Sequence, residues 1–121
     1  WQRERLLREL RGARITVPEL QQLINAGGQP TFVDVRPAAS RARDGTTPGA
    51  LQLSLESAHA EAPDLPRDAE VVVYCACPNE VSAAQVARQL RRAGFLNVRP
   101  LMGGIDAWIA AGLPIERIHS V

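Results

Sequence analysis

Cys75 and Cys77 are the residues of this chain best suited to nucleophilic chemistry. Residues 71–74 are Val-Val-Val-Tyr, a β-prone run that predicts a buried strand leading directly into Cys75. Apolar residues then recur at helical spacing from Ala83, which predicts a helix shortly after the cysteine. A loop between such a strand and helix directs backbone N–H groups and the positive end of the helix dipole at one point. We therefore expect a thiol at Cys75 to lose its proton readily.

Cys77 has three open interpretations. It is a small buried thiol that fills space, a resolving thiol that forms a disulfide or shares sulfur with Cys75, or a metal ligand. The two histidines, His59 and His119, are far away in sequence, and no second cysteine pair exists to complete four ligands. We therefore expect no zinc site, no other metal and no cofactor.

The order of strand and helix patterns predicts an α/β fold. Thr16 to Glu19 fits a capping box that starts a helix, and Gly27-Gly28 ends it. Strands are expected over residues 31–35, 51–55, 71–75 and 96–101, with helices over 56–62, 81–93 and after 103–104. The prolines and glycines of residues 36–49 indicate an irregular segment with at most one helical turn. Strands separated by helices favour a central parallel sheet, here of about five strands, with helices on both faces.

Two of these helices have apolar stripes that should face the core. In the first helix the stripe consists of Leu20, Leu23 and Ile24. In the last helix Ile105, Trp108 and Ile109 are expected to point inward.

Four short motifs, in register around the strand, cysteine, loop and helix, resemble those of rhodanese-like domains. Phe32–Arg36 resembles a strand ending in D-V-R, Pro48–Ala50 an I-P-G-A turn, Gly103–Trp108 a G-G-x-x-A-W helix start, and Ala111–Pro114 an A-G-x-P ending. The resemblance covers roughly residues 13–115. It implies one rhodanese-like domain over residues 15–115, followed by a tail at 116–121. It also implies a thiosulfate-type sulfurtransferase fold, with Cys75 at the position that carries sulfur as a persulfide.

The chemistry of such a site is a two-step exchange. A thiolate attacks the sulfane sulfur of thiosulfate or a polysulfide, and the sulfur then passes from Cys75 to a thiol or cyanide-like acceptor. Backbone N–H groups of a curled loop stabilise anionic sulfur without any proton transfer. The expected substrate-binding donors are Ala76, Cys77, Asn79, Glu80, Val81 and Ser82. Pro78 has no N–H, so one potential donor is missing.

The loop departs from the commoner rhodanese-like pattern in its charge. It contains no cation and one anion, Glu80, so a dianionic donor should bind less well. Glu80 is alternatively a first-turn acid that stabilises its own helix. Asp34 and Arg36 are expected to support the site as an ion pair or loop anchor, with Arg36 as a substrate cation the alternative.

Two other functions compete with sulfur transfer for this topology. Phosphatases and arsenate reductases of this topology need a longer loop that ends in an arginine, whereas Val81 follows this loop and the next arginine is Arg88. The second alternative is a non-catalytic sensory or regulatory module attached to a membrane protein, for which the acidic, proline-containing loop is the evidence.

Composition sets limits on compartment and partners. The 121 residues suit one domain, and a net charge of +1 gives no general attraction to nucleic acid. Two cysteines do not form a disulfide framework, which favours the cytoplasm. The chain also contains no apolar run of about 20 residues.

Residues 1–14 differ from the rest of the chain because they hold five arginines and two glutamates. We expect a basic N-terminal helix or juxtamembrane linker there, suited to the cytoplasmic face of the inner membrane. This segment and the loop also resemble the rhodanese-like tails of bacterial DedA-type membrane proteins. Because the chain opens on Trp1, we expect it to be excised from a longer protein, with a possible membrane tether in the missing region.

Overall fold

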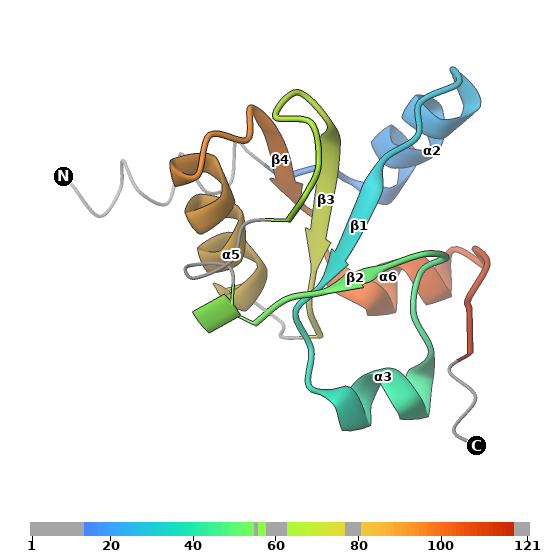
Figure 1. Cartoon of the computed structure of the whole chain (residues 1–121). Coiled ribbons are helices and arrows are strands. Elements are labelled where there is room, and N and C mark those ends of the chain that lie inside the picture. Colours follow the sequence, from blue (N-terminus) through green and yellow to red (C-terminus); the bar gives the residue numbers. More distant parts are fainter. Residues whose placement is uncertain (1–13, 55, 58–62, 77–80, 118–121) are drawn as a thin grey trace, which may run out of the picture.

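A parallel four-stranded sheet forms the centre of the computed structural model, which describes residues 14–54, 56–57, 63–76 and 81–117. The strands are β1 (Thr31–Asp34), β2 (Leu51–Gln52), β3 (Glu70–Tyr74) and β4 (Asn97–Pro100), in the spatial order β2-β1-β3-β4 (Figure 1). Asp34 pairs with both Gln52 and Tyr74, so β1, β2 and β3 end at the same edge. Beyond β4, Ile15 adds one parallel bridge to Leu101.

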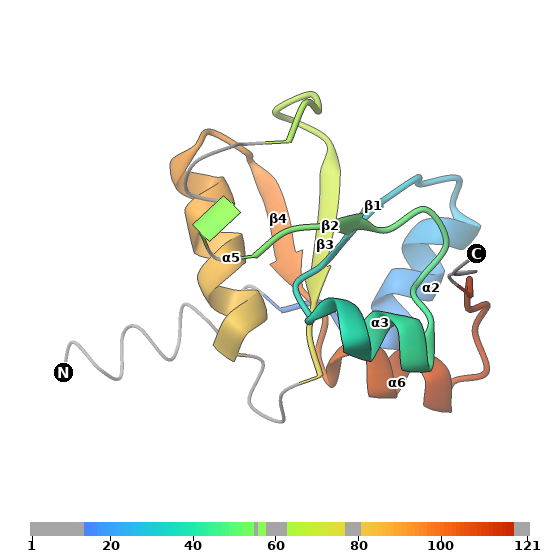
Figure 2. The same cartoon turned by 60° about the horizontal axis from the view of Figure 1, so that its bottom comes forward.

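Helices cover both faces of this sheet. The helices of the described part of the chain are α2 (Val17–Asn25), α3 (Ala38–Asp44), α5 (Val81–Arg92) and α6 (Gly104–Ala110), of which α3 buries no residue. Figure 2 shows α5 on one side of the sheet and α2 and α6 on the other. The predicted α/β class, with a parallel sheet between helices, is confirmed.

Side-chain alternation along β3 divides the core into two clusters. Val71 and Val73 face α5, where they pack with Val86 and Leu90 of that helix. Val72 and Tyr74 point to the opposite face and join the cluster that holds Leu20 of α2 and Ile105 and Trp108 of α6. Because neighbouring residues of a strand point to opposite faces, β3 is buried on both sides, as its continuous apolar run predicts.

The predicted capping box at the start of α2 is present. Glu19 N–H donates to Thr16 Oγ1 at 3.2 Å, and Thr16 N–H donates to Glu19 Oε1 at 3.1 Å. The hydrogen bonds from the Thr16 side chain and backbone lower the pKa of Glu19 below its ordinary value.

The expectation of at most one helical turn in residues 36–49 was wrong, because α3 is seven residues long. The helix begins after Pro37 and ends at Gly45, whose φ of 81° suits glycine. No α3 residue is buried, so the helix carries no apolar periodicity by which it could be recognised.

Other boundaries also differ from the expectation. The strand predicted over residues 51–55 pairs over two residues only, and Leu55 lies outside the described residues. Of the helix predicted over 56–62, residues 56–57 are described and are helical. Ile24 and Ile109, expected in the core, are 39% and 43% exposed, because each lies at the margin of its helix's apolar stripe. The basic segment at residues 1–13 lies outside the described residues.

Candidate active site around Cys75

Cys75 directly follows the last residue of β3 at the carboxyl edge of the sheet. Strand alternation places it on the same face as Val71 and Val73, where it packs in the cluster that contains Ala83 and Val86 of α5. Its exposed fraction is 3%. The predicted order of buried strand, cysteine, connecting segment and helix is therefore confirmed, since α5 begins at Val81.

The backbone of Cys75 is held by the start of α6. Ile105 N–H donates to the Cys75 carbonyl oxygen at 3.1 Å. This approach requires glycine at position 104, because a Cβ there would overlap the Cys75 carbonyl oxygen, and the φ of Gly104 is 59°. The glycine pair at 103–104 thus allows a helix to begin against the end of the strand that carries the cysteine.

The predicted backbone donors lie only partly within the described residues. Ala76 is exposed directly after Cys75, and Val81 and Ser82 are exposed at the first positions of α5. The first N–H groups of a helix have no acceptor within that helix, which suits Val81 and Ser82 to donation. Cys77, Asn79 and Glu80 lie outside the described residues. The convergence of these donors on sulfur stays a prediction.

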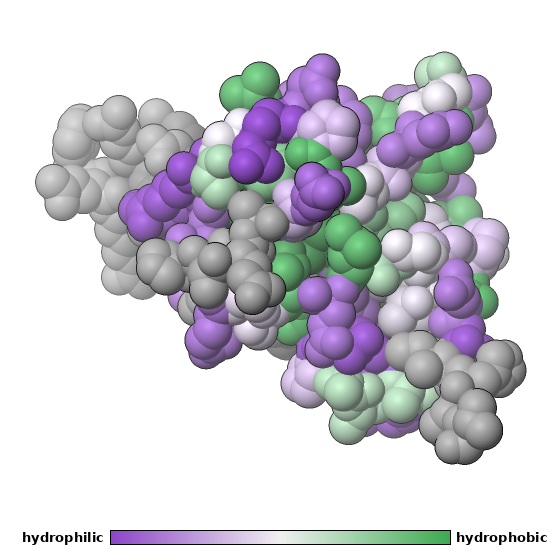
Figure 3. Space-filling model, viewed as in Figure 1, coloured by the Kyte–Doolittle hydropathy of each residue, from purple (hydrophilic) through white to green (hydrophobic). Residues whose placement is uncertain are grey.

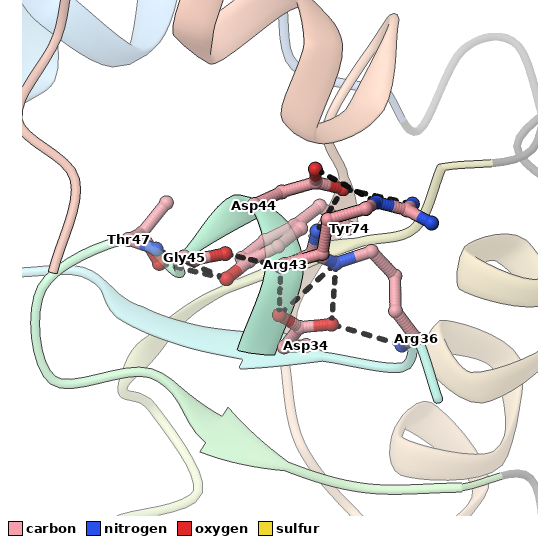
Figure 4. A network of polar contacts seen from close by, with 7 residues as sticks. All are labelled: Asp34, Arg36, Arg43, Asp44, Gly45, Thr47 and Tyr74. Atoms are coloured by element: carbon pink, nitrogen blue, oxygen red, sulfur yellow. Dashed lines mark hydrogen bonds and ion pairs between the residues drawn. The ribbon is translucent and has the colours of Figure 1, made fainter. Parts of the chain in front are cut away.

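Asp34 and Arg36 form the predicted ion pair at the end of β1 (Figure 4). Arg36 Nη2 donates to Asp34 Oδ2 at 2.7 Å, and Arg36 Nε and backbone N–H donate to Oδ1 at 3.1 and 2.9 Å. Arg36 is 3% exposed and Asp34 is 1% exposed. Because this guanidinium is buried and engaged, the geometry favours the loop anchor over the substrate cation.

Arg36 also holds together the two ends of the segment that contains α3, residues 36–45. Its Nη2 donates to the Gly45 carbonyl oxygen at 2.6 Å, and its Nη1 lies 3.6 Å from Asp44 Oδ2. Burial alone would lower the pKa of Arg36, but hydrogen bonding and charge from Asp34, aided by Asp44, raise it above the ordinary value. The guanidinium therefore stays charged and ties residues 44–45 to the end of β1.

Tyr74 and Thr47 extend this network, and neither was predicted as a site residue from the sequence. Thr47 N–H and Oγ1 donate to the Tyr74 hydroxyl at 3.1 and 3.2 Å, and both residues are fully buried. Burial raises the pKa of Tyr74, the Thr47 hydrogen bonds oppose the rise, and the charge of Asp34 adds to it. The sequence signal for this contact is a tyrosine at the end of a run of valines, because a buried tyrosine hydroxyl needs a hydrogen-bonding partner.

Comparison with known proteins identifies the family. The rhodanese-like domain model matches residues 16–111. A sulfurtransferase of Allochromatium vinosum is 37% identical over 84 residues, which are 69% of this chain and 76% of the relative. A protein from Anabaena sp. with a known crystal structure is 30% identical in sequence to this chain. The two structures superpose with a TM-score of 0.74 over 86% of this chain and 80% of the Anabaena chain.

Another relative is an HTH-type transcriptional regulator of Mycobacterium tuberculosis. It is 34% identical over 102 residues, which are 84% of this chain and 44% of the regulator. The chain thus spans less than half of the regulator's length. Taken with the matched model, these findings show that the chain belongs to the rhodanese-like domain family.

No helix in the described part of the chain is both long and apolar enough to cross a membrane.

The buried ion pair generates a stability prediction. Arg36→Met should lower the free energy of unfolding by about 3–5 kcal/mol, because it leaves the Asp34 carboxylate buried without its cation. Urea denaturation measures this loss. Arg43→Met is the matched control: Arg43 pairs with Asp44 at the surface and should cost no more than about 1 kcal/mol. Equal small losses in the two variants would contradict the anchoring role of Arg36.

Proposed function

We propose that this protein is a sulfurtransferase or sulfur carrier that forms a persulfide on Cys75 and passes the sulfur to a thiophilic acceptor. The observation that carries the proposal is the position of Cys75, between the end of β3 and the start of α5. Membership of the rhodanese-like family and 37% identity to a sulfurtransferase support the same chemistry.

The proposed reaction has two displacement steps. The Cys75 thiolate attacks the sulfane sulfur of thiosulfate or a polysulfide, the S–S bond of the donor breaks, and sulfite or a shortened polysulfide leaves with the electron pair. An acceptor thiolate or cyanide then attacks the terminal sulfur of the persulfide, and Cys75 departs as a thiolate. No external oxidant or reductant is required.

Two contacts support Cys75 as a positioned nucleophile. Its carbonyl oxygen accepts a hydrogen bond from Ile105 N–H, and its side chain belongs to the core cluster that includes Ala83 at the beginning of α5. The side chain therefore lies close to the positive end of the α5 dipole, where an anion is favoured. Backbone donation to the anionic sulfur from residues 76–82 other than Pro78 completes the proposed mechanism.

A second candidate function is regulatory. The M. tuberculosis relative is named a transcriptional regulator, and this chain aligns with only 44% of it, which favours a rhodanese-like unit joined to other segments. In that role a persulfide or oxidised Cys75 would act as a signal. The membrane tether, the cytoplasmic placement and the role of residues 1–14 remain predictions of the sequence.

The first functional prediction concerns the sulfur-carrying residue. After incubation with thiosulfate or polysulfide, the intact protein should gain the mass of one sulfur atom, and cyanide should remove it. Cys75→Ser should abolish the gain, because serine cannot form a persulfide. Cys77→Ala is the matched control and should still be loaded. A full gain in Cys75→Ser would assign the chemistry to another residue.

The second functional prediction concerns the charge of the loop. Glu80→Arg should lower the apparent KM for thiosulfate by up to about tenfold, because it replaces repulsion of the dianion by attraction, and added salt should reduce the difference. Glu80→Gln separates the two effects, since it removes the repulsion without adding attraction. If the wild type and both variants have the same KM at low and high ionic strength, the repulsion is contradicted, and Glu80 acts only as an acid that stabilises its helix.

A further inference from the structure

The exposed side of α5 is basic, and the helix itself contains no acidic residue. Arg88 and Arg92 are exposed and four residues apart, so they share one side of the helix. Arg91 is half-buried and donates through Nη1 to the Val98 carbonyl oxygen at 3.3 Å. We call Arg88, Arg91 and Arg92 the α5 basic face. Figure 3 shows mainly hydrophilic side chains over the outer side of this helix.

The α5 basic face differs from those arginines of the described part of the chain that form ion pairs. Arg36, Arg43 and Arg99 each pair with an acidic side chain, at 2.7, 3.0 and 3.3 Å. None of the described carboxylates forms an ion pair with Arg88 or Arg92, and residues 81–92 contain no acidic residue. Within the described part of the chain, no ion pair holds Arg88 or Arg92, which suits these two side chains to an external partner.

The distance of Arg88 and Arg92 from the start of α5 favours a macromolecule over a small sulfur donor as their ligand. The rise of a helix is about 1.5 Å per residue, so Arg88 and Arg92 lie roughly 10 and 16 Å along the axis from Val81. A thiosulfate ion at Cys75 cannot reach both arginines. A protein that covers the start of α5 can contact both of them while one of its thiols enters the site.

We propose that the α5 basic face docks an acidic protein that accepts sulfur from Cys75. The inference rests on the proposed persulfide chemistry and adds the class of acceptor. Carboxylates of the partner would pair with Arg88 and Arg92, and long-range attraction would raise the rate of encounter. This charge complementarity identifies the partner as an acidic polypeptide that presents a cysteine.

The transfer step conserves atoms and charge. The partner's cysteine thiolate attacks the terminal sulfur of the Cys75 persulfide and forms a new S–S bond. The S–S bond to Cys75 breaks, and its electron pair remains on the Cys75 thiolate. The partner leaves as a persulfide, and no net oxidation occurs.

The test uses two synthetic peptides, each with one cysteine, flanked in one by aspartates and glutamates and in the other by asparagines and glutamines. At low salt, sulfur transfer from the loaded protein to the acidic peptide should be about tenfold faster than to the neutral one. Arg88→Gln/Arg92→Gln should reduce this preference to less than about twofold. Transfer to cyanide, which needs no docking, should keep its wild-type rate.

Gln22→Glu/Gln29→Glu is the matched control, because it changes the net charge equally at exposed positions outside α5. It should keep most of the preference. The proposal would be overturned if the arginine variant kept its full preference for the acidic peptide, or if both variants lost this preference equally. Binding of anionic lipid vesicles through these arginines, with no peptide preference, would assign the face to a membrane and also overturn the proposal.

A binding measurement separates this inference from the proposed function. A version of the acidic peptide with serine in place of cysteine should shift the NMR signals of α5 amides in the wild type but not in the arginine variant. If these shifts occur and Cys75 never gains sulfur, the proposed function fails and the docking face stands. If Cys75 is loaded and the shifts are absent, the docking face fails alone.

Discussion

The buried ion pair between Asp34 and Arg36 is the interaction on which the carboxyl edge of the sheet depends. Two charges removed from water are tolerated only when they neutralise each other and their remaining donors and acceptors are engaged. Arg36 meets most of this requirement through Asp34 and the Gly45 carbonyl oxygen, while its Nη1 has no hydrogen-bond partner and lies 3.6 Å from Asp44 Oδ2. The pair therefore fixes how the chain leaves β1, passes through α3 and returns to β2.

The same edge holds Cys75 by a different kind of constraint. Close contact between Gly104 and the Cys75 backbone allows the Ile105 N–H to meet the Cys75 carbonyl oxygen. On the opposite side of β3, the Tyr74 hydroxyl is fixed by Thr47. Tyr74 at the end of β3 and Cys75 after it are thus tied to separate parts of the chain, which limits the freedom of the cysteine.

Much of this arrangement follows from local sequence patterns. The valine run predicts β3, the capping box predicts the start of α2, and four short motifs predict the rhodanese-like family. The sequence could not predict α3, because the helix buries no side chain and is held by contacts at its ends. It also could not distinguish the two roles of Arg36. That distinction depends on burial and on Gly45, a residue nine positions away that reaches the guanidinium only in the folded chain.

A crystal structure of the protein incubated with thiosulfate, without an acceptor, tests directly whether Cys75 carries sulfur. We expect one additional sulfur atom bonded to Cys75 Sγ, with backbone N–H groups of residues 76–82 other than Pro78 directed at it. An unmodified Cys75 in a fully loaded sample, or an additional sulfur on Cys77 alone, would contradict the account.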